Sequence, residues 1–332
     1  MKKFLSLILC GFLLLSACDS PTTPVSGSFQ SMDTFMQLDI YGSEEDLKIA
    51  ESKILEIGNL LDTTYKNSDI YKLNETGRAR LNDTTADVLS QSLELCAKLD
   101  GYLDISIYPI VEEWGFISGD YKIPEAERLS KLLESVDYKN IKLEENFAQL
   151  PENTRLDLGA VAKGYAADIA FDMLSQRGVR SGLLNLGGTV AAMGKKPTGE
   201  AWRIGICDPE NTASHFGYLQ CSDKIVATSG NYERYFEQDG KRYCHIIDPK
   251  TGMAVDNGTV SVTVISDSGI KCDALSTALF VMGIDKTQEY WESNRDFDFI
   301  LLDDSDRLYV TDGIAKDFKL IDGYDFEMKI LK

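Results

Sequence analysis

The residues most suited to binding or catalysis lie in the stretch Arg155-Leu-Asp-Leu-Gly-Ala-Val-Ala-Lys-Gly-Tyr-Ala-Ala-Asp168. Leucines alternate with Asp157, which predicts a half-buried strand end, and apolar residues recur at helical spacing over residues 160–176. A turn that opens a helix presents free backbone N–H groups, so it attracts anions. Lys163 falls in the first helical turn, where a cation opposes the helix dipole unless an anion lies nearby. The pattern predicts that Asp157 and Lys163 flank a backbone anion site; a plain strand–helix corner capped by Asp157 is the alternative.

A second candidate is the imidazole of His245, in His245-Ile-Ile-Asp-Pro-Lys-Thr-Gly252. The sequence contains two histidines, and the other, His215, falls in a polar loop without chemical neighbours. His245 is expected to end a strand just before a turn. An imidazole there could act as a general base near neutral pH. The alternative is a strand-end histidine that only hydrogen bonds the turn backbone.

A third candidate pairs a carboxylate with a hydroxyl one helical turn apart, in Asp273-Ala-Leu-Ser-Thr277. Residues i and i+4 lie on one face of a helix. Hard oxygen ligands of this kind suit Mg²⁺ that is held partly by substrate phosphates. Alternatively, Asp273 caps the helix and the hydroxyl of Thr277 faces the core.

The elements that must position these residues mix helices and strands without strict βαβ alternation, which predicts the α+β class. Residues 29–41 are expected to form a strand, Ser43-Glu-Glu-Asp46 resembles a capping box, and Thr85 can cap a second long helix. Asp239-Gly240 predicts a tight hairpin turn. Further strands are expected over 182–186, 202–207, 216–221, 225–228, 234–237, 242–247, 260–266, 297–302 and 308–310. Further helices are expected over 68–74, 109–116, 124–135, 272–282 and 287–291.

The N-terminus has the features of an export signal. Two lysines precede an apolar run over residues 4–15 that is too short to span a bilayer as a mature helix. The run ends in Leu15-Ser-Ala-Cys18, which resembles a bacterial lipobox, in which cleavage leaves a diacylated Cys18 as the new N-terminus. An ordinary signal peptide that contains a cysteine is the alternative. We expect a signal peptide over 1–17, the lipidated Cys18 and a flexible tether over 18–28, and one domain, or two closely packed lobes, over 29–332.

Location and partners follow from the same features. A lipid-anchored body would lie at the bacterial cell membrane, facing the periplasm or the cell exterior, and Asp19 resembles an inner-membrane retention signal. The formal net charge of −19 argues against a nucleic-acid partner. It also makes a divalent cation useful at any phosphate site. The cysteines form no C-x-x-C pair and have no metal-finger spacing.

Taken together, six motifs in order resemble the ApbE-type family of FAD:protein FMN transferases, over nearly all of residues 29–330. They are Met32-Asp-Thr34, Leu156-Asp-Leu-Gly-Ala-Val-Ala-Lys-Gly-Tyr-Ala-Ala-Asp168, Asn185-Leu-Gly-Gly188, Ala227-Thr-Ser-Gly-Asn-Tyr232, His245-Ile-Ile-Asp-Pro-Lys-Thr-Gly252 and Asp273-Ala-Leu-Ser-Thr-Ala278. The resemblance implies a T-fold-like α+β core, FAD as substrate, and Mg²⁺, or Mn²⁺, as cofactor. It implies transfer of FMN from FAD to a threonine or serine hydroxyl of an acceptor flavoprotein, with release of AMP. Subunits of extracytoplasmic redox complexes are the acceptors that it suggests.

The resemblance also implies roles for single residues. The metal would be held by Asp273, Thr277 and the backbone carbonyl of Ala160, assisted by Ser276. FAD would contact Met32, Tyr65, Tyr102, Leu103, Asp104, Asp157, Lys163 and Ile247. Transferase members carry an aromatic residue at the position of Tyr65, whereas asparagine there resembles relatives that hydrolyse FAD. Asp33 departs from the more usual Met-Gly-Thr, which puts FAD contacts at that strand in doubt.

In this picture His245 takes the proton from the acceptor hydroxyl as it attacks the FMN phosphorus, while Lys163 and the metal neutralise the leaving AMP. Two alternatives remain open. The first is a Mg²⁺-dependent FAD pyrophosphatase that yields FMN and AMP. The second is a non-catalytic flavin-binding lipoprotein, although a passive binder would need no combination of metal and base.

Overall fold

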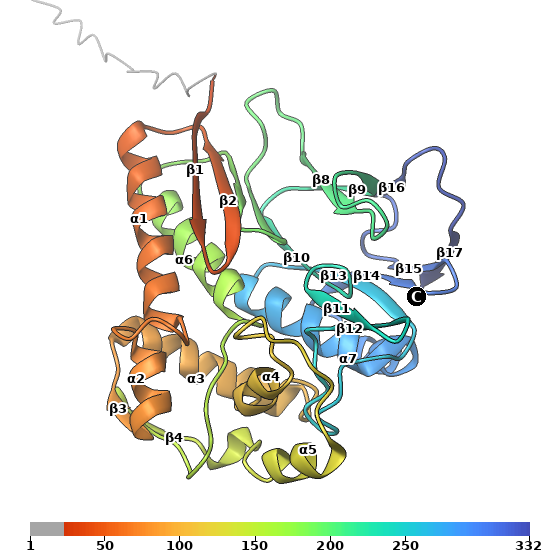
Figure 1. Cartoon of the computed structure of the whole chain (residues 1–332). Coiled ribbons are helices and arrows are strands. Elements are labelled where there is room, and N and C mark those ends of the chain that lie inside the picture. The colour runs from red at the N-terminus through yellow and green to blue at the C-terminus, as the bar shows by residue number, and fades with distance from the viewer. Residues whose placement is uncertain (1–22) are drawn as a thin grey trace, which may run out of the picture.

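The computed structural model of the chain describes residues 23–332, and Figure 1 shows how its elements are arranged. The expected signal peptide and Cys18 lie outside the described residues. The framework is a nine-stranded sheet with helices packed on it, so the expected α+β class is confirmed. Within the described residues, no helix is both long and apolar enough to cross a bilayer.

The central sheet has the strand order β1-β2-β6-β7-β10-β13-β14-β15-β17, and every neighbouring pair is antiparallel except β15–β17. Its strands are β1 (Val25–Ser31), β2 (Thr34–Ile40), β6 (Gly182–Asn185), β7 (Thr189–Met193), β10 (Lys224–Gly230), β13 (Thr259–Ser266), β14 (Asp298–Asp303), β15 (Arg307–Thr311) and β17 (Glu327–Leu331). Inner strands such as β13 and β14 are buried along almost their whole length, because both faces of the sheet are covered there.

The first expected strand proves to be a hairpin. Residues 29–41 were expected to run straight, but β1 and β2 pair from Val25↔Ile40 to Ser31↔Thr34 around a two-residue turn. Met32 and Asp33 form this turn with φ of 49° and 57°, a left-handed conformation that glycine and asparagine usually supply. Met-Asp carries no such signal, so the turn was missed. The strand also begins at Val25, inside the stretch that was expected to be a flexible tether up to residue 28.

The helices are α1 (Glu44–Leu61), α2 (Asp69–Thr76), α3 (Asp83–Lys98), α4 (Tyr108–Glu113), α5 (Ala126–Leu133), α6 (Ala162–Gln176) and α7 (Gly269–Ser293), with a 3₁₀ turn, η1 (Tyr138–Asn140). The capping box at the start of α1 is confirmed, since Ser43 and Asp46 exchange side-chain to backbone hydrogen bonds. Thr85 does not cap α3: Asn82 does, and Thr85 is buried within the helix with its hydroxyl on Asp69. The two expected C-terminal helices form α7, with a kink at Gly283.

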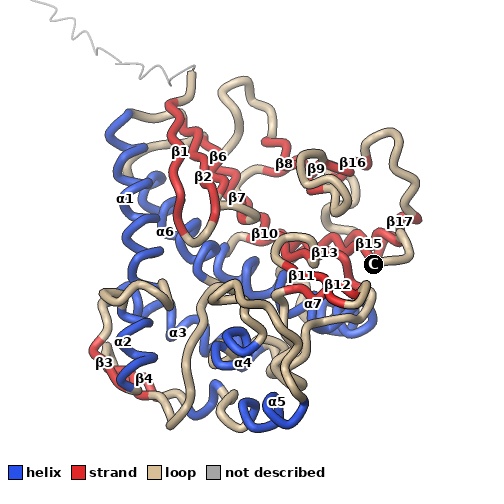
Figure 2. The backbone as a smooth tube through the Cα atoms, viewed as in Figure 1, coloured by secondary structure: helices blue, strands red, loops and turns tan. Residues whose placement is uncertain are grey.

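Helices α1, α6 and α7 pack against the sheet through one large hydrophobic cluster. Figure 2 shows these helices on one side of the strands. The opposite face carries a small sheet of β8 (Trp202–Cys207), β9 (His215–Cys221) and β16 (Phe318–Leu320), which packs through a second cluster. β7, β16 and β17 were not expected, because segments of 5, 3 and 5 residues are too short to show a clear alternation.

A third cluster joins α4 and α5 to a separate hairpin of β11 (Tyr235–Gln238) and β12 (Lys241–Cys244). Its expected turn is confirmed, because Asp239 and Gly240 both have positive φ, at 53° and 75°. Buried Trp114 donates its indole N–H to the carbonyl of Gly252 at 2.8 Å, which ties α4 to the turn after His245. A last small sheet is formed by β3 (Arg78–Arg80), β4 (Lys142–Glu144) and β5 (Phe147–Gln149).

Candidate active site

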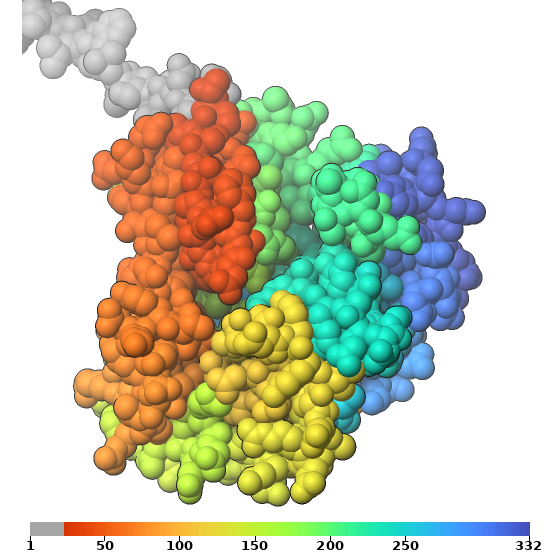
Figure 3. All heavy atoms as spheres, in the orientation of Figure 1, coloured from red at the N-terminus to blue at the C-terminus, as the bar shows by residue number. Residues whose placement is uncertain are grey.

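The candidate site is a cavity of about 1330 Å³ between the tip of the β1–β2 hairpin, the start of α6, the first turns of α7 and the segment that links β10 to β12. Figure 3 shows a recess between the N-terminal segments and the segments coloured green to cyan. Most of the site residues expected from the sequence line it: Met32, Tyr102, Leu103, Asp104, Asp157, Ala160, Lys163, His245, Ile247, Asp273 and Thr277. Segments more than a hundred residues apart in the sequence therefore meet in one cavity, as the motifs predicted.

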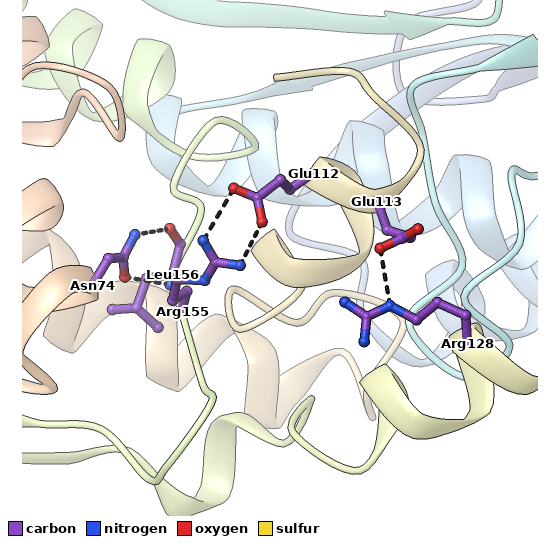
Figure 4. Close-up of polar contacts among 6 residues, drawn as sticks. All are labelled: Asn74, Glu112, Glu113, Arg128, Arg155 and Leu156. Carbon is purple, nitrogen blue, oxygen red and sulfur yellow. Dashed lines mark hydrogen bonds and ion pairs between the residues drawn. The ribbon is translucent and has the colours of Figure 1, made fainter. Parts of the chain in front are cut away.

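The segment that leads into the cavity is held by side chains rather than by a sheet. Residues 156–158 were expected to end a strand, but they form no named strand, and Arg155 makes one isolated bridge to Ile107. Asn74 replaces the missing strand neighbour, because its amide bonds both the N–H (2.7 Å) and the C=O (2.9 Å) of Leu156 (Figure 4). The guanidinium of Arg155 donates two hydrogen bonds to the carboxylate of Glu112 on α4. Next to this ion pair, Arg128 forms a second one with Glu113. These contacts fix where Asp157 enters the cavity.

The expected backbone anion site at the start of α6 is largely absent. The N–H groups of Val161 and Ala162 both bond the carbonyl of Leu158, and the N–H of Gly164 bonds the carboxylate of Asp273 at 2.8 Å. In the first turn of α6, the N–H groups of Ala162 and Gly164 are therefore taken. Asp157 does not cap α6 either, because its carboxylate accepts from the N–H of Gly159.

The corner between α6 and α7 is suited to a divalent cation. Asp273 is 5% exposed, and its two oxygens accept from Gly164 N–H and from the hydroxyl of Thr189, both at 2.8 Å. Within residues 23–332, no lysine or arginine nitrogen lies within 4.0 Å of this carboxylate. A buried carboxylate without a cationic partner is costly unless a cation is bound. Each oxygen retains a lone pair for one.

Ala160 supplies a second oxygen at this corner. The N–H of Gly164 would normally bond the carbonyl of Ala160, four residues earlier, but it turns to Asp273 instead. In the part of the chain that the structure describes, no hydrogen bond ends on the Ala160 carbonyl, and Ala160 lines the cavity. Thr277, one turn beyond Asp273, lines the cavity with its hydroxyl 3.3 Å from that of Ser229. A carboxylate, a carbonyl and a hydroxyl are hard oxygen ligands that fit Mg²⁺.

Ser276 was expected to assist in holding the metal. Its side chain is buried and does not line the cavity; its hydroxyl lies 2.8 Å from that of Ser229 and donates to the carbonyl of Asp273. Ser229, which does line the cavity, was not singled out from the sequence, although it lies in the Ala227–Tyr232 motif. Direct metal ligation by Ser276 stays a prediction, and its observed contacts orient Ser229 and the first turns of α7.

The close contact of α6 with α7 is made possible by two glycines and one cap. A Cβ on Gly164 would lie 2.0 Å from the carbonyl oxygen of Gly269, so only glycine lets the two backbones touch. Asp168 accepts from the N–H groups of Gly269 and Ile270, at 2.6 and 2.9 Å, and so binds the first turn of α7. The last aspartate of the Leu156–Asp168 motif therefore has a structural role, which is to hold α7 where Asp273 can meet α6.

The cavity holds two cations and several carboxylates. Lys163 lines it, and no carboxylate oxygen of the described residues lies within 4.0 Å of its ammonium. Arg234 and Glu233, which the sequence reasoning missed as site residues, also line it. Desolvation at the cavity wall raises the pKa of Glu233 to about 7, against the opposing charges of Lys163 and Arg234. Burial likewise raises the pKa of Asp157. An anionic substrate would need Lys163, Arg234 and a metal to offset these carboxylates.

His245 has the geometry of a neutral base. Its Nδ1 lies 3.1 Å from the carbonyl oxygen of Arg234, which can only accept, so Nδ1 carries the proton and Nε2 has a free lone pair. Burial and the positive charges of Arg234 and Lys163 lower the pKa of His245 to about 4. The imidazole therefore hydrogen bonds a backbone carbonyl, as in the alternative of a purely structural histidine, but it also lines the cavity.

The remaining expected FAD contacts divide into three groups. Met32 and Ile247 line the cavity from the hairpin tip and from just beyond β12. Tyr102 is flanked by Lys250, whose ammonium lies 3.5 Å from its ring centre, and the carboxylate of Asp104 is held by Ser106 and the N–H of Tyr138. Tyr65 is 46% exposed and lines a smaller neighbouring pocket rather than the main cavity. Its contact with a cofactor stays a prediction.

The fold and the site define a mixed α+β protein with a large cavity lined by charged and apolar residues, and solved flavin transferases have this fold. The ApbE protein from Thermotoga maritima has a TM-score of 0.82 at 26% identity, covering 89% of this chain and 99% of that one. The flavin transferase ApbE from Vibrio cholerae has a TM-score of 0.79 at 26% identity, covering 90% and 100%. These structures match almost from end to end.

The sequence comparisons identify the family. The ApbE family model matches residues 32–301, and the chain therefore belongs to the ApbE family. It is 31% identical to the FAD:protein FMN transferase of Vibrio cholerae over 301 residues, which cover 86% of this chain and 90% of that protein. It is 30% identical to the FAD:protein FMN transferase of Haemophilus influenzae, with 89% and 91% covered.

Proposed function

We propose that this protein transfers FMN from FAD to a threonine or serine hydroxyl of an acceptor flavoprotein and releases AMP. The names of its relatives support this activity. The observation that carries it is the presence of a neutral imidazole with a free Nε2, His245, in the same cavity as Lys163 and the Ala160–Asp273 corner. The cavity, at about 1330 Å³, exceeds the ~300–1,000 Å³ typical of drug-sized ligands, as a dinucleotide requires.

The chemistry requires one bond to form and one to break. The acceptor oxygen attacks the FMN phosphorus, the bond from that phosphorus to the bridging oxygen breaks, and AMP leaves with the bridging oxygen. The proton of the acceptor hydroxyl passes to Nε2 of His245, which later returns it to solvent. General-base help of this kind contributes ~10²–10⁴-fold. Lys163 and Arg234 bring positive charge to the negative charge that develops on the diphosphate.

We propose Mg²⁺, with Mn²⁺ as the alternative, as the metal of this site. The carboxylate of Asp273, the hydroxyl of Thr277 and the carbonyl of Ala160 would hold it, and their lone pairs support that assignment. When bound, the metal would neutralise phosphate charge in a cavity that already contains Asp157 and Glu233.

The proposed activity is tested by incubating the protein with FAD, Mg²⁺ and candidate acceptors from extracytoplasmic redox complexes. A mass gain of one FMN on an acceptor threonine or serine is the expected result. Release of free FMN and AMP without an acceptor would identify a pyrophosphatase instead, and FAD binding without turnover in either assay would identify a passive binder. The matched control is His245→Ala, in which FAD binding should persist and transfer should be lost.

We also propose that Cys18 is lipidated and that the protein is anchored at the bacterial cell membrane, facing the periplasm or the cell exterior. The lipobox-like sequence before Cys18 supports this location. The expected result is incorporation of radiolabelled palmitate into the full-length protein and its recovery with membranes. In Cys18→Ala both should be lost; label retained in that variant would contradict the anchor.

A further inference from the structure

Arg234 makes contacts at the cavity wall that none of the six motifs explains. Its guanidinium Nη2 donates to the carbonyl oxygen of Phe116, at the end of the α4 region, at 2.5 Å. Its own carbonyl oxygen accepts twice from His245, from the backbone N–H at 2.9 Å and from Nδ1 at 3.1 Å. One residue therefore joins the α4 region to the imidazole.

The partner of Arg234 is rigidly placed. Phe116 is 2% exposed and belongs to the hydrophobic cluster of α4, α5 and the β11–β12 hairpin. Its ring also lies edge-on to the imidazole of His245, with ring centres 6.4 Å apart and an interplanar angle of 69°. Because the carbonyl of Phe116 cannot move freely, the bond from the guanidinium limits the movement of the Arg234 backbone.

We propose that Arg234 is a positioning residue for His245: its side chain anchors on Phe116, so that its backbone carbonyl holds Nδ1–H and leaves Nε2 free to accept a proton. The importance of that proton transfer rests on the proposed function, but the positioning does not. A carbonyl oxygen has no proton to donate, so its contact with Nδ1 selects one tautomer. The wrong tautomer would present N–H, not a lone pair, to the acceptor hydroxyl.

The charges around the imidazole act in the same direction. Arg234 and Lys163, from the β10–β11 segment and from α6, are the charged groups that act on His245, and both disfavour its protonation. Glu233 and Asp157 also line the cavity and share these two cations as neighbours. The positive charge of Arg234 thus keeps the imidazole neutral while the carbonyl of the same residue sets its tautomer.

The test is nitrogen-15 NMR of the two histidines, with Arg234→Gln as the variant. The wild-type protein should show His245 with the proton on Nδ1, and His215 serves as an internal reference. In Arg234→Gln the Nδ1–H tautomer should lose population and the pKa of His245 should move up toward its usual range. Transfer should fall ~10-fold or more in kcat. Arg234→Lys, which can still donate to Phe116, should recover part of the tautomer signal.

Arg242→Gln is the matched control, because Arg242 lies on the same hairpin but points to Tyr235 and Glu237 and does not line the cavity. It should leave the signals of His245 unchanged. An Nε2–H tautomer in the wild-type protein would overturn the proposal, even if Arg234→Gln failed to fold. So would unchanged tautomer and pKa in a folded Arg234→Gln. These readouts need no turnover, so an absence of FMN transfer would count against the proposed function and not against the positioning role.

Discussion

At the scale of single residues, the site pairs groups whose surroundings push their pKa values away from the usual range. Desolvation and the positive charges of Arg234 and Lys163 lower the pKa of His245 to about 4, whereas desolvation raises the pKa of Glu233 to about 7. The histidine thus remains available as a base over the whole physiological range, and the glutamate is the group of the two that changes charge within it. Groups with opposed shifts in one cavity are typical of acid–base sites.

This arrangement predicts an unusual pH profile. Protonation of His245 removes the base, so activity should fall on the acid side near pH 4 and not near 6.5. We expect kcat/KM to show no histidine limb between pH 5.5 and 8. Any limb near pH 7 should belong to Glu233 and disappear in Glu233→Gln. The measurement is the pH dependence of transfer for both proteins; an acid limb near 6.5 that survives in Glu233→Gln would contradict it.

Asp33 combines an unfavourable backbone conformation with a negative charge in the cavity. It adopts a φ of 57° at the tip of the β1–β2 hairpin and adds a carboxylate to the cavity. Glycine adopts this conformation freely, which accounts for the more usual Met-Gly-Thr. Asp33→Gly should raise the free energy of unfolding by at most ~1 kcal/mol and tighten FAD binding about 2- to 5-fold, because it removes one negative charge near the phosphates.

The comparison is Asp239→Gly, since Asp239 has a φ of 53° in the exposed β11–β12 turn and lies outside the cavity. Chemical denaturation and FAD titration of both variants separate conformation from charge. Equal FAD affinity in Asp33→Gly and wild type would show that the Asp33 carboxylate does not act on the substrate.

At the scale of elements, two of the sequence motifs pack directly against each other. A Cβ on Gly187, in Asn185-Leu-Gly-Gly188, would lie 2.1 Å from the hydroxyl oxygen of Thr34, in Met32-Asp-Thr34. The double-glycine turn is thus needed so that β6 and β7 can turn beside the hairpin that carries Met32. Such reasons are invisible in the sequence, because they depend on which segments become neighbours.

The crossing of α6 with α7 permits a test in which two effects have opposite signs. By helix propensity alone, Gly164→Ala should stabilise α6 by ~0.5–1 kcal/mol. Its Cβ would instead meet the backbone of Gly269 at 2.0 Å, so we expect a loss of ~1–3 kcal/mol and weaker metal binding, as Asp273 moves away. Urea unfolding measures the change in stability. Gln176→Ala, at the exposed end of the same helix, should change stability by less than ~0.5 kcal/mol. A stabilised Gly164→Ala would show that the two backbones are not in tight contact.

How far the sequence predicted this protein depends on the range of the interactions involved. Local signals were sufficient for the capping box at Ser43, the Asp239-Gly240 turn and the α+β class. They failed where a distant group decides the structure: the amide of Asn74 replaces a strand beside Leu156, and Asp273 takes the N–H of Gly164 that was expected to face an anion. The motifs indicated which segments meet at the cavity, because each of them contributes at least one lining residue. Arg234 was missed because its role rests on contacts with Phe116 and His245.

At the scale of the whole molecule, the net charge of −19 is the dominant condition for binding an anionic dinucleotide. Within the cavity, Asp33, Asp157, Glu233 and Asp273 face Lys163 and Arg234, so the carboxylates outnumber these cations. FAD would enter against repulsion unless a divalent cation bound with it. Metal and substrate should therefore bind cooperatively, each raising the affinity of the protein for the other.

This coupling is measurable without turnover. FAD affinity, followed by flavin fluorescence, should fall at least ~10-fold when Mg²⁺ is replaced by EDTA, since one charge pair in a partly buried site contributes ~1.4 kcal/mol or more. Asp273→Ala should bind FAD about equally with and without Mg²⁺, because the carboxylate of the proposed metal site is removed. Asp172→Ala, which removes an exposed carboxylate from α6 outside the cavity, should keep the full dependence on Mg²⁺. If Asp273→Ala kept it too, the cation would bind elsewhere, and the corner between α6 and α7 would have to be explained by packing alone.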